Sequence, residues 1–288
     1  METNYFIKIK QLFLDVLKKS IICKACVRIE NSKMIPSNLG DDLNYTFLPQ
    51  IFNKPISLYD YSFIAHKFNT SNYLFIGSTI EMLADSNTIV WGAGCISSES
   101  KIPHPKKVLA VRGPLTRKRL LDAGIECPAV YGDPALLLPL FYTPTKKKKY
   151  KIGIIPHYLD INTPFIEKLK TFTHEHLVID MANYSSYQNI IEKICSCEII
   201  LSSSLHGLIL AEAYGIPNIW IKCSDNIMGG NFKFHDFFCS INRDRKKPYL
   251  SQDINNINDI TDIISHWESG EINLSQLIES APFQIKKS

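Results

Sequence analysis

The sequence lacks the short motifs that mark several well-known classes of enzyme site. It has no GxGxxG, no GxxxxGKS and no GxxxxGKT, so the dinucleotide-binding fingerprint and the P-loop are excluded; the GAG at residues 92–94 is too short to count. It has no HExxH zinc motif and no GxSxG nucleophile elbow. It also has no apolar run of about 18 residues, so we expect no membrane-spanning helix.

A strong charge bias is also missing. The 288 residues include 32 Lys and Arg against 28 Asp and Glu, a net charge of +4 that is too mild to favour a nucleic acid as partner. A locally basic cleft for an anionic substrate is compatible with this balance.

The eight cysteines do not form a recognisable metal-binding pattern. Cys23 and Cys26 have a CxxC spacing, but no second pair and no histidine pair follows at metal-ligand spacing. Charges interrupt the apolar residues of segment 1–15, which does not resemble a signal peptide. We therefore expect free thiols, Cys195 and Cys197 included, no metal, and a reducing, cytoplasmic location.

Residues 5–17 have the spacing of an amphipathic helix, with lysines around the rest of the turn. The apolar positions are Tyr5, Phe6, Ile9, Leu12, Phe13, Val16 and Leu17. We favour packing of this face onto the body of the protein; peripheral association with the inner face of a membrane is the alternative.

Short apolar runs alternate with turns and helical patterns from about residue 72 to 140, which predicts a first α/β unit within residues 1–142. The runs NYLFIG, TIVWGAG and KKVLAVRG have too little polar alternation for half-exposed strands, so they predict buried strands of a parallel sheet. PLTRKRLLDAG predicts a helix at residues 114–124. Residues 143–150 contain four consecutive lysines and predict a solvated linker.

The same alternation restarts after the linker and predicts a second α/β unit at residues 151–288. The expected strands are KIGIIPHY, HLVIDM, EIILSSS and IPNIWIK, and the expected helices between them are TPFIEKLKTF, SYQNIIEKICS and LHGLILAEAYG. The helical segments NDITDIISHWES and LSQLIES follow. The predicted fold class is therefore α/β, with two Rossmann-like domains whose strand ends face each other across a cleft, where ligands bind in such sheets.

The sharpest local signal for a functional site is SSSLHG at residues 202–207, between a predicted strand and a predicted helix. Ser203 and Ser204 are expected to cap backbone N–H groups at this turn, and the positive end of the helix dipole favours a bound phosphate or carboxylate. His206 lies in the first helical turn and would point into the same pocket. The alternative is a capped helix whose histidine only packs.

The second signal is VRGPLTR at residues 111–117, where a predicted strand ends and Pro114 starts a helix. Arg112 therefore lies at the carboxyl edge of the sheet, where its planar guanidinium suits two-point contact with a phosphate or carboxylate. The alternative for Arg112 is a salt bridge to a neighbouring strand. At least two of the three basic residues that follow on the helix are expected to be solvated: Arg117, Lys118 and Arg119.

Two further segments carry weaker signals. NLGDDLN at residues 38–44 leads into a helical pattern, where Asp41 or Asp42 could cap the helix, bind sugar hydroxyls or take a proton from one. Lys233 follows two glycines in GGNFKFHD, a loop that could close over a phosphate, although a solvent-exposed lysine is the default.

Taken together, these segments resemble the polysaccharide pyruvyl transferase family. The resemblance extends from about residue 38 to residue 238 in matching order and spacing, through SNLGDDLN, IGSTIEML, VWGAG, VRGPLTRKRLLDAG, YGDPALLLP and SSSLHGLILAEAYGIPNIWI. Arg112 matches the family's arginine in the RGP segment, His206 the histidine of the SxxLHG segment, and Lys233 a downstream lysine. Ser204 departs from the pattern, because many relatives have arginine there.

The resemblance implies a GT-B-like pair of domains, phosphoenolpyruvate as donor, and no metal or other cofactor. It implies transfer of the enolpyruvyl unit to two hydroxyls of a sugar, such as galactose or a related hexose on a lipid-linked oligosaccharide, making a pyruvate ketal in capsule or exopolysaccharide synthesis. The implied catalytic residues are His206, Arg112 and Lys233. The expected donor-binding residues are Arg112, Arg117, Ser203, Ser204, Leu205, His206 and Gly207. The expected acceptor-binding residues are Asn38, Gly40, Asp41, Asp42 and Asn44.

This chemistry fits the residue types. Protonation of the enol methylene gives an oxocarbenium ion that one sugar hydroxyl attacks; phosphate then leaves and the second hydroxyl closes the ring. We expect His206 to donate the proton or bind phosphate, Arg112 and Lys233 to neutralise the anionic groups, and Asp41 or Asp42 to orient the hydroxyls. Two alternatives stay open: a nucleotide-sugar-dependent glycosyltransferase of the same architecture, and a non-catalytic scaffold of a polysaccharide assembly complex.

Overall fold

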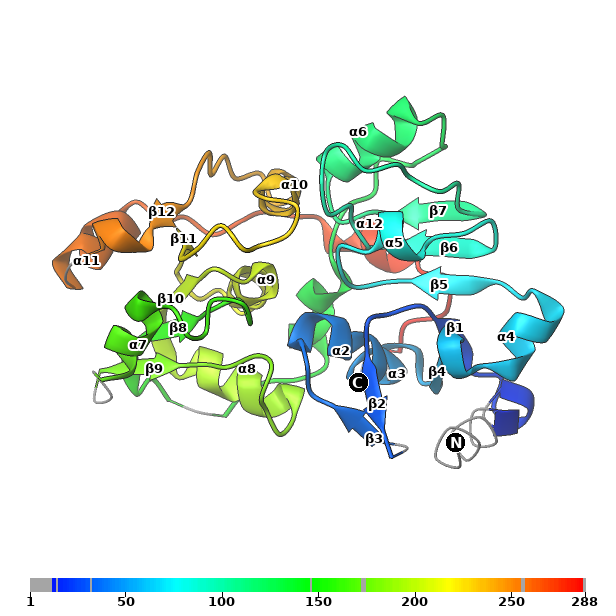
Figure 1. Cartoon of the computed structure of the whole chain (residues 1–288), viewed down its shortest axis with the longest axis horizontal. Coiled ribbons are helices and arrows are strands. Elements are labelled where there is room, and N and C mark those ends of the chain that lie inside the picture. Colours follow the sequence, from blue (N-terminus) through cyan, green and yellow to red (C-terminus); the bar gives the residue numbers. More distant parts are fainter. Residues whose placement is uncertain are drawn as a thin grey trace.

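A computed structural model describes residues 12–13, 15–31, 33–145, 147–171, 175–254 and 257–286 of the chain. Two five-stranded parallel sheets dominate these residues (Figure 1). The strands of the first sheet lie between residues 21 and 110, and those of the second between residues 150 and 250. The expected α/β class with parallel sheets is confirmed.

The first sheet has the order β4-β1-β5-β6-β7, and its neighbouring strands are parallel. Its strands are β1 (Ile21–Cys23), β4 (Ile56–Leu58), β5 (Asn72–Leu74), β6 (Thr88–Trp91) and β7 (Lys107–Ala110). Every residue of β1 and β4 is buried, as expected for a sheet covered on both faces. The three strands predicted from apolar runs in this half correspond to β5, β6 and β7. A separate antiparallel hairpin is formed by β2 (Arg28–Glu30) and β3 (Lys33–Ile35).

The helices of this half begin and end where the local sequence favours it. They are α2 (Leu39–Thr46), α3 (Leu48–Phe52), η1 (Tyr59–Tyr61), α4 (Phe63–Phe68), α5 (Ile80–Leu83), α6 (Pro114–Asp122) and η2 (Pro134–Leu140). Pro114 starts α6, and Gly124, with a φ of +74°, follows its end, so the predicted helix is confirmed. The helix expected after the NLGDDLN segment begins earlier, at Leu39, so the prediction of Asp41 or Asp42 as N-cap is wrong: the N-cap is Asn38, and both aspartates lie in the first turn. The expected single helix is also divided into α2 and α3, because Pro49 has no N–H to continue the first helix.

The second sheet has the order β12-β11-β10-β8-β9, again with parallel neighbours. Its strands are β8 (Tyr150–Ile155), β9 (His176–Val178), β10 (Cys197–Ser202), β11 (Asn218–Lys222) and β12 (Tyr249–Leu250). Its helices are α7 (Pro164–Lys170), α8 (Tyr187–Cys195), α9 (Leu205–Ala213), α10 (Phe232–Ser240), η3 (Ser251–Asp253), α11 (Ile257–Ser265) and α12 (Leu274–Glu279). The expectation of a loop at Lys233 is wrong: Gly229 and Gly230 make a turn at positive φ, and α10 begins two residues later.

The last helix of the chain packs against the first sheet rather than the second. Trp91 Nε1 donates a hydrogen bond to the carbonyl of Leu277 in α12 (2.9 Å), and the Phe283 ring contacts Phe52 at 5.5 Å between centroids. Figure 1 shows α12 beside β6, whereas α11 lies at the opposite end of the molecule. The division into units at residues 1–142 and 151–288, with a linker at 143–150, and the GT-B-like arrangement stay predictions.

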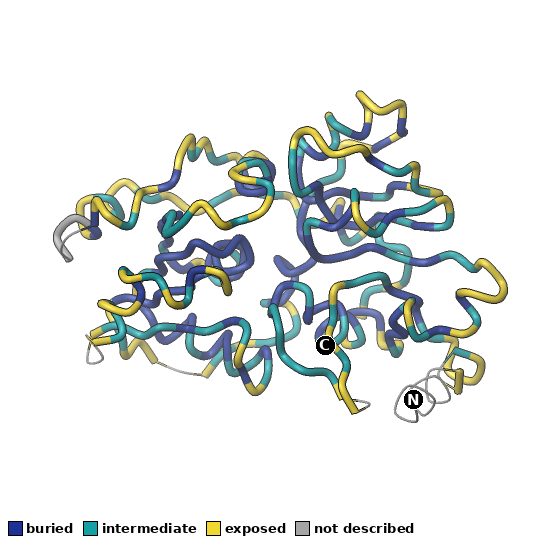
Figure 2. Tube along the Cα trace, viewed as in Figure 1, coloured by how far each residue is buried: buried dark blue, intermediate teal, exposed yellow. Residues whose placement is uncertain are grey.

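Helix α9 is the most deeply placed element near the carboxyl ends of the strands. All of its residues except the last are buried, and Figure 2 shows its tube dark blue. It contacts β10 and β11 of the second sheet and also η2, which comes from the first half of the chain. Side chains in the first turn of α9 are therefore held between the two halves.

The amphipathic helix predicted at residues 5–17 lies mostly outside the described residues. Four of its apolar side chains are described and are exposed: Leu12, Phe13, Val16 and Leu17. Among the described parts of the chain, no helix is both long enough and apolar enough to cross a membrane.

Candidate active site

Residues that follow the carboxyl ends of strands in both sheets meet between the two sheets. Arg112 follows β7 in the first half, whereas His157 follows β8 and His206 follows β10 in the second. Arg112 forms an ion pair with Asp236 of α10, and His206 packs against Gly40 of α2. Because ligands bind at the carboxyl edges of parallel sheets, we take this convergence as the candidate active site.

Serine side chains fix the turn from β10 into α9, but they do not cap the helix as expected. Ser202 Oγ accepts a hydrogen bond from Ser204 N (3.0 Å), and Ser204 is the N-cap residue. The hydroxyl of Ser204 makes no capping hydrogen bond within the described chain. The positive end of α9 is thus not occupied by its own N-cap side chain, which leaves it available to an anion.

Ser203 is committed to a buried hydrogen-bond network. Its hydroxyl donates to Asp160 Oδ2 (2.7 Å) and accepts from the backbone N–H of His157 (2.9 Å). Asp160 is fully buried and also accepts from Ser224 Oγ. Ser203 therefore joins the ends of β8 and β10 and has its hydroxyl hydrogen already donated.

Leu205 and Gly207 were both predicted to bind the donor, but in the structure both serve the packing of α9. Leu205 is buried in the core. A Cβ on Gly207 would lie 2.3 Å from Ser202 Oγ and 2.8 Å from Ile155 Cγ2, so glycine allows α9 to lie close to the sheet. What these two residues can offer a ligand is their backbone N–H groups in the first turn of α9.

His206 lies between α2 and the start of η2. Its Nε2 is 3.6 Å from Asp133 Oδ2, and neither buried atom has a hydrogen-bond partner among the described residues. On the other side of the ring, a Cβ on Gly40 would lie 2.0 Å from Nδ1, so only glycine lets the imidazole approach the first turn of α2. The predicted donor residue His206 and acceptor residue Gly40 are thus in contact.

The two adjacent aspartates, which sequence reasoning could not separate, have different environments. Asp42 is fully buried and accepts hydrogen bonds from Ser37 N (3.0 Å), Asn38 N (3.2 Å) and Tyr184 OH (2.7 Å). These bonds fix the entry to α2 and tie it to the second half of the chain. Asp42 is therefore a structural residue in this state.

Asp41 is the aspartate that faces the other charged groups. It is half-buried and accepts a hydrogen bond from Asn38 Nδ2 (2.7 Å). Burial raises the pKa of Asp41 to about 6, against the opposing effects of His206, Asn38 and Lys233. A carboxyl group with this pKa can exchange protons near neutral pH.

The other predicted acceptor residues support this turn. Asn38 orients Asp41 through the hydrogen bond just described. Asn44 is fully buried, donates to Ile76 O (2.9 Å) and accepts from Ile76 N (3.0 Å), so it fastens α2 to the chain after β5. Asn44 is placed by the structure in the scaffold rather than at the contact with His206.

Lys233 lies in the first turn of α10 and is buried, with a residue exposure of 8%. Burial and, to a smaller extent, the nearby Arg112 lower the pKa of Lys233, and Asp41 raises it; the result is a pKa of about 8. The default expectation of a solvent-exposed lysine is wrong. We refer to Asp41, Asp133, His206 and Lys233 as the open cluster, because its charged groups have few hydrogen bonds to one another.

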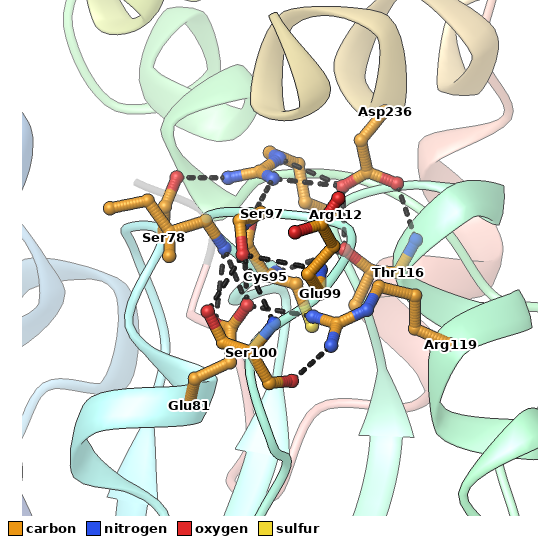
Figure 3. Close-up of polar contacts among 11 residues, drawn as sticks. Ser78, Glu81, Cys95, Ser97, Glu99, Ser100, Arg112, Thr116, Arg119 and Asp236 are labelled. Carbon is orange, nitrogen blue, oxygen red and sulfur yellow. Dashed lines mark hydrogen bonds and ion pairs between the residues drawn. The ribbon is translucent and has the colours of Figure 1, made fainter. Parts of the chain in front are cut away.

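Arg112 belongs to a second group, the paired cluster, which comprises Ser78, Arg112, Thr116 and Asp236 (Figure 3). Arg112 Nε and Nη2 lie 3.0 and 2.9 Å from Asp236 Oδ2, and Nη1 donates to Ser78 Oγ (2.6 Å). Asp236 also accepts from Thr116 N (2.8 Å) and Thr116 Oγ1 (2.7 Å). Both charged side chains are fully buried. Arg112 thus forms a salt bridge, but with a helix of the second half rather than with a neighbouring strand.

Arg117 is the predicted donor residue that the structure does not bring to either cluster. Its Nε donates to Cys127 O (3.1 Å), beyond the end of α6. Lys118 is exposed beside Asp122, and Arg119 pairs with Glu81 at 2.8 Å, which helps to hold the loop after β6 (Figure 3). Of these three basic residues, Lys118 is the solvated one.

Sequence reasoning missed four side chains at this site: Asp133, His157, Asp160 and Asp236. His157 follows a predicted buried strand directly, so the edge rule that selected Arg112 also selects His157. Burial and the charge of Lys233 lower the pKa of His157 to about 4, and its Nδ1 accepts a hydrogen bond from Leu159 N (3.3 Å). The hydrogen of the neutral ring is therefore on Nε2.

Two cavities lie away from the candidate site. One of about 710 Å³ is lined by residues 104–109 and 124–128, at the amino end of β7, and one of about 370 Å³ lies between β11 and α11. Neither contains residues of the open or the paired cluster. In the described part of the chain, no group of three or more His, Cys, Asp or Glu side chains is arranged to hold a metal ion, and the eight cysteines are free.

Comparison with known proteins shows the family to which the chain belongs. A model of the family described as polysaccharide pyruvyl transferase matches residues 38–225, more than half of the chain. An uncharacterized protein of Acanthamoeba polyphaga mimivirus is 29% identical over 192 residues, which cover 65% of this chain and 66% of that protein. The match therefore spans just under two thirds of the relative's length. No solved structure matches the chain.

Proposed function

Because the chain belongs to the polysaccharide pyruvyl transferase family, we propose that it moves the enolpyruvyl unit of phosphoenolpyruvate onto two hydroxyls of a sugar, forming a pyruvate ketal. The acceptor in this proposal is a hexose on a lipid-linked oligosaccharide, and the product enters a capsular or extracellular polysaccharide. No metal takes part.

One observation carries the assignment of the donor site: Lys233 is buried in α10, a helix that contacts α9, whose positive end is uncapped, and its charge acts on Asp41 and His157. Among the described residues Lys233 forms no ion pair, and burying its charge is unfavourable, which the lowered pKa of Lys233 reflects. An anion in this position would restore the missing charge interaction. Phosphoenolpyruvate carries two anionic groups, a phosphate and a carboxylate, that suit Lys233 and the N–H groups of α9.

Arg112 contributes to this site through Asp236 in the state described. The ion pair fixes α10 against α6, and the first turn of α10 carries Lys233. Asp41 follows Gly40, which contacts the His206 ring, and its charge interacts with His206; in this proposal Asp41 is the base that takes a proton from a sugar hydroxyl. In this proposal the donor contacts the second half of the chain, and the acceptor contacts α2.

Thermal unfolding with added ligands tests the donor. We expect phosphoenolpyruvate to raise the midpoint of the wild-type protein, the His206→Ala variant to lose most of that rise, and His104→Ala, which changes an exposed histidine, to keep it. A rise with UDP- or GDP-sugars and none with phosphoenolpyruvate would replace pyruvyl transfer by glycosyl transfer. The absence of any rise with either ligand class would favour a scaffold.

Peripheral association with the inner face of the membrane is the second part of the proposal. It is supported by the exposed apolar side chains Leu12, Phe13, Val16 and Leu17. Sedimentation with vesicles of anionic lipid tests it: the wild type should sediment, and a Phe13→Ser, Leu17→Ser double variant should stay in the supernatant. Equal sedimentation of the two proteins would contradict it.

A further inference from the structure

Asp133 has one carboxylate oxygen that the fold uses and one that it does not. Oδ1 accepts a hydrogen bond from Ala135 N (2.9 Å) and so caps η2. Oδ2 is buried and has no hydrogen-bond partner among the described residues, although it lies 3.6 Å from His206 Nε2, which is also buried and unpartnered. A cap requires only one oxygen, so the second is free to serve another purpose.

Two buried polar atoms that face each other without a hydrogen bond raise the free energy of the folded protein. A buried polar atom without a hydrogen bond is unfavourable, and here a strong acceptor lies opposite a ring nitrogen that can carry a hydrogen. Hydrogen bonds between catalytic groups are often long in the free enzyme and shorten when the substrate binds. A shift of less than about 1 Å would bring Nε2 and Oδ2 into ordinary hydrogen-bond distance.

We propose that Asp133 is the positioning residue that keeps a hydrogen on His206 Nε2, so that Nδ1 is the nitrogen that exchanges a proton with the reactants. This inference rests on the proposed pyruvyl transfer. The Gly40 backbone lies against the Nδ1 part of the ring, and Asp41, the next residue of α2, is close enough for its charge to interact with His206. The charged groups around the ring are Asp133 from η2 and Asp41 from α2, and Lys233 from α10 faces Asp41.

These groups can donate and accept every proton that the proposed reaction moves. Nδ1–H of the doubly protonated ring gives its proton to the methylene carbon of phosphoenolpyruvate, so a C–H bond forms and the central carbon becomes an oxocarbenium ion. The first sugar hydroxyl adds to that carbon and loses its proton to Asp41. The C–O bond to phosphate then breaks, and phosphate leaves with the proton from Asp41. The second hydroxyl closes the ketal and returns a proton to Nδ1.

The test is the variant Asp133→Asn. The asparagine carbonyl can keep the bond to Ala135 N, but its NH2 group faces His206 and donates to Nε2, which moves the hydrogen of the neutral ring to Nδ1. We expect kcat for phosphate release to fall at least about 100-fold, while the dissociation constant of phosphoenolpyruvate changes less than about 3-fold. Glu192→Gln makes the same chemical change at a buried carboxylate that binds Tyr142 and serves as the control.

A spectroscopic readout separates this inference from the proposed function. Two-dimensional nitrogen–proton NMR of the imidazoles, with His206 identified by its loss in His206→Ala, should show the Nε2–H tautomer in the wild type and the Nδ1–H tautomer in Asp133→Asn. An Nδ1–H tautomer in the wild type, or kcat within about 3-fold of wild type in Asp133→Asn, would overturn the role of Asp133. If the wild type neither binds phosphoenolpyruvate nor releases phosphate, the proposed function fails, and the NMR result still decides the tautomer.

Discussion

The two buried polar clusters between the sheets differ in how completely their charges are paired. In the paired cluster, Arg112 and Asp236 have no exposed surface and bind each other, Ser78, Thr116 and the carbonyl of Cys95 through six contacts of 3.0 Å or less. In the open cluster, His206 Nε2 and Asp133 Oδ2 are buried and have no hydrogen-bond partner in the described part of the chain, and the pKa values of Asp41 and Lys233 are shifted toward neutrality.

How completely the charges are paired distinguishes residues that hold the two halves of the chain together from residues that can act on a ligand. A buried ion pair with all its hydrogen bonds made has little to offer a substrate, and breaking it is costly. Buried groups that lack partners store an unfavourable energy that a ligand can relieve, and their shifted pKa values suit proton transfer. Proximity to the site alone does not distinguish these roles, because both clusters lie at strand ends.

The largest expected effect is on stability in the paired cluster. Asp236→Ala leaves the Arg112 guanidinium buried without its charge partner and should lower the free energy of unfolding by about 3 to 5 kcal/mol. Urea unfolding measures it. Glu268→Ala removes an exposed carboxylate that pairs with Arg243 and should change stability by less than about 1 kcal/mol. Equal losses in the two variants would show that Asp236 is not a structural tie.

The pH dependence of kcat/KM should reflect the protonation states of the residues of the open cluster. Asp41 must be ionised to accept a proton, whereas Lys233 and His206 must both be protonated, so the rate should rise through about pH 6 and fall at higher pH, no later than about pH 8. Each limb should change the rate about tenfold per pH unit. Asp41→Asn should remove the acid limb, and Lys233→Arg should remove the part of the alkaline limb that is due to the lysine. A profile that is flat from pH 5 to pH 9 contradicts both assignments.

The adjacent aspartates should respond differently to loss of the carboxylate. Burial raises the pKa of Asp42 as well, but Asp42→Ala leaves three close donors without their acceptor and should cost about 1 to 3 kcal/mol of unfolding free energy. Asp41 has a raised pKa, so the cost of ionising its buried carboxyl lowers the free energy of unfolding, and this cost is present in full above about pH 6. Asp41→Asn should therefore cause no loss of stability at pH 8. Urea midpoints measured in parallel test the contrast, and a larger loss for Asp41→Asn reverses it.

The smallest effect is a gain in stability. The folded pKa of Lys233 is lowered, so the unfolded chain binds more protons between about pH 8 and 10.5, and the cost of burying the charge is present in full below pH 8. Lys233→Met should stabilise the fold by about 1 kcal/mol at pH 7, and the gain should fade toward pH 10.5. Lys118→Met, at an exposed position, is the control. A loss of stability at pH 7 would mean that the lysine is structural.

Sequence patterns located four of the five strands of the second sheet and three of the five strands of the first, and the reason is physical. Strands β8, β10 and β11 are runs of five or six residues with mostly buried side chains, and such runs stand out from their polar surroundings. Strands β5 and β9 have three residues each but lie within the longer apolar runs NYLFIG and HLVIDM. Strands β1 and β4, also of three residues, and β12, of two, lie in no such run. Pairing across the sheet, rather than local pattern, makes them strands.

The site was predictable where chemistry and backbone position coincide, as in His206 at the start of a helix. It was not predictable where a partner lies far away in the sequence: Asp236 binds Arg112 across 124 positions, and Asp133 meets His206 only in the folded chain. Arg117 shows the opposite failure. A cation near a helix start suggested an anion site, but the side chain extends to Cys127 O, a direction that the sequence does not specify.

The most direct test of the account is calorimetric titration of phosphoenolpyruvate into three folded proteins: wild type, Lys233→Met and Arg117→Met. If the open cluster binds the donor, the dissociation constant should rise at least about tenfold in Lys233→Met and stay within about twofold of wild type in Arg117→Met. Unchanged binding in Lys233→Met together with weakened binding in Arg117→Met would contradict the account and place the donor at α6.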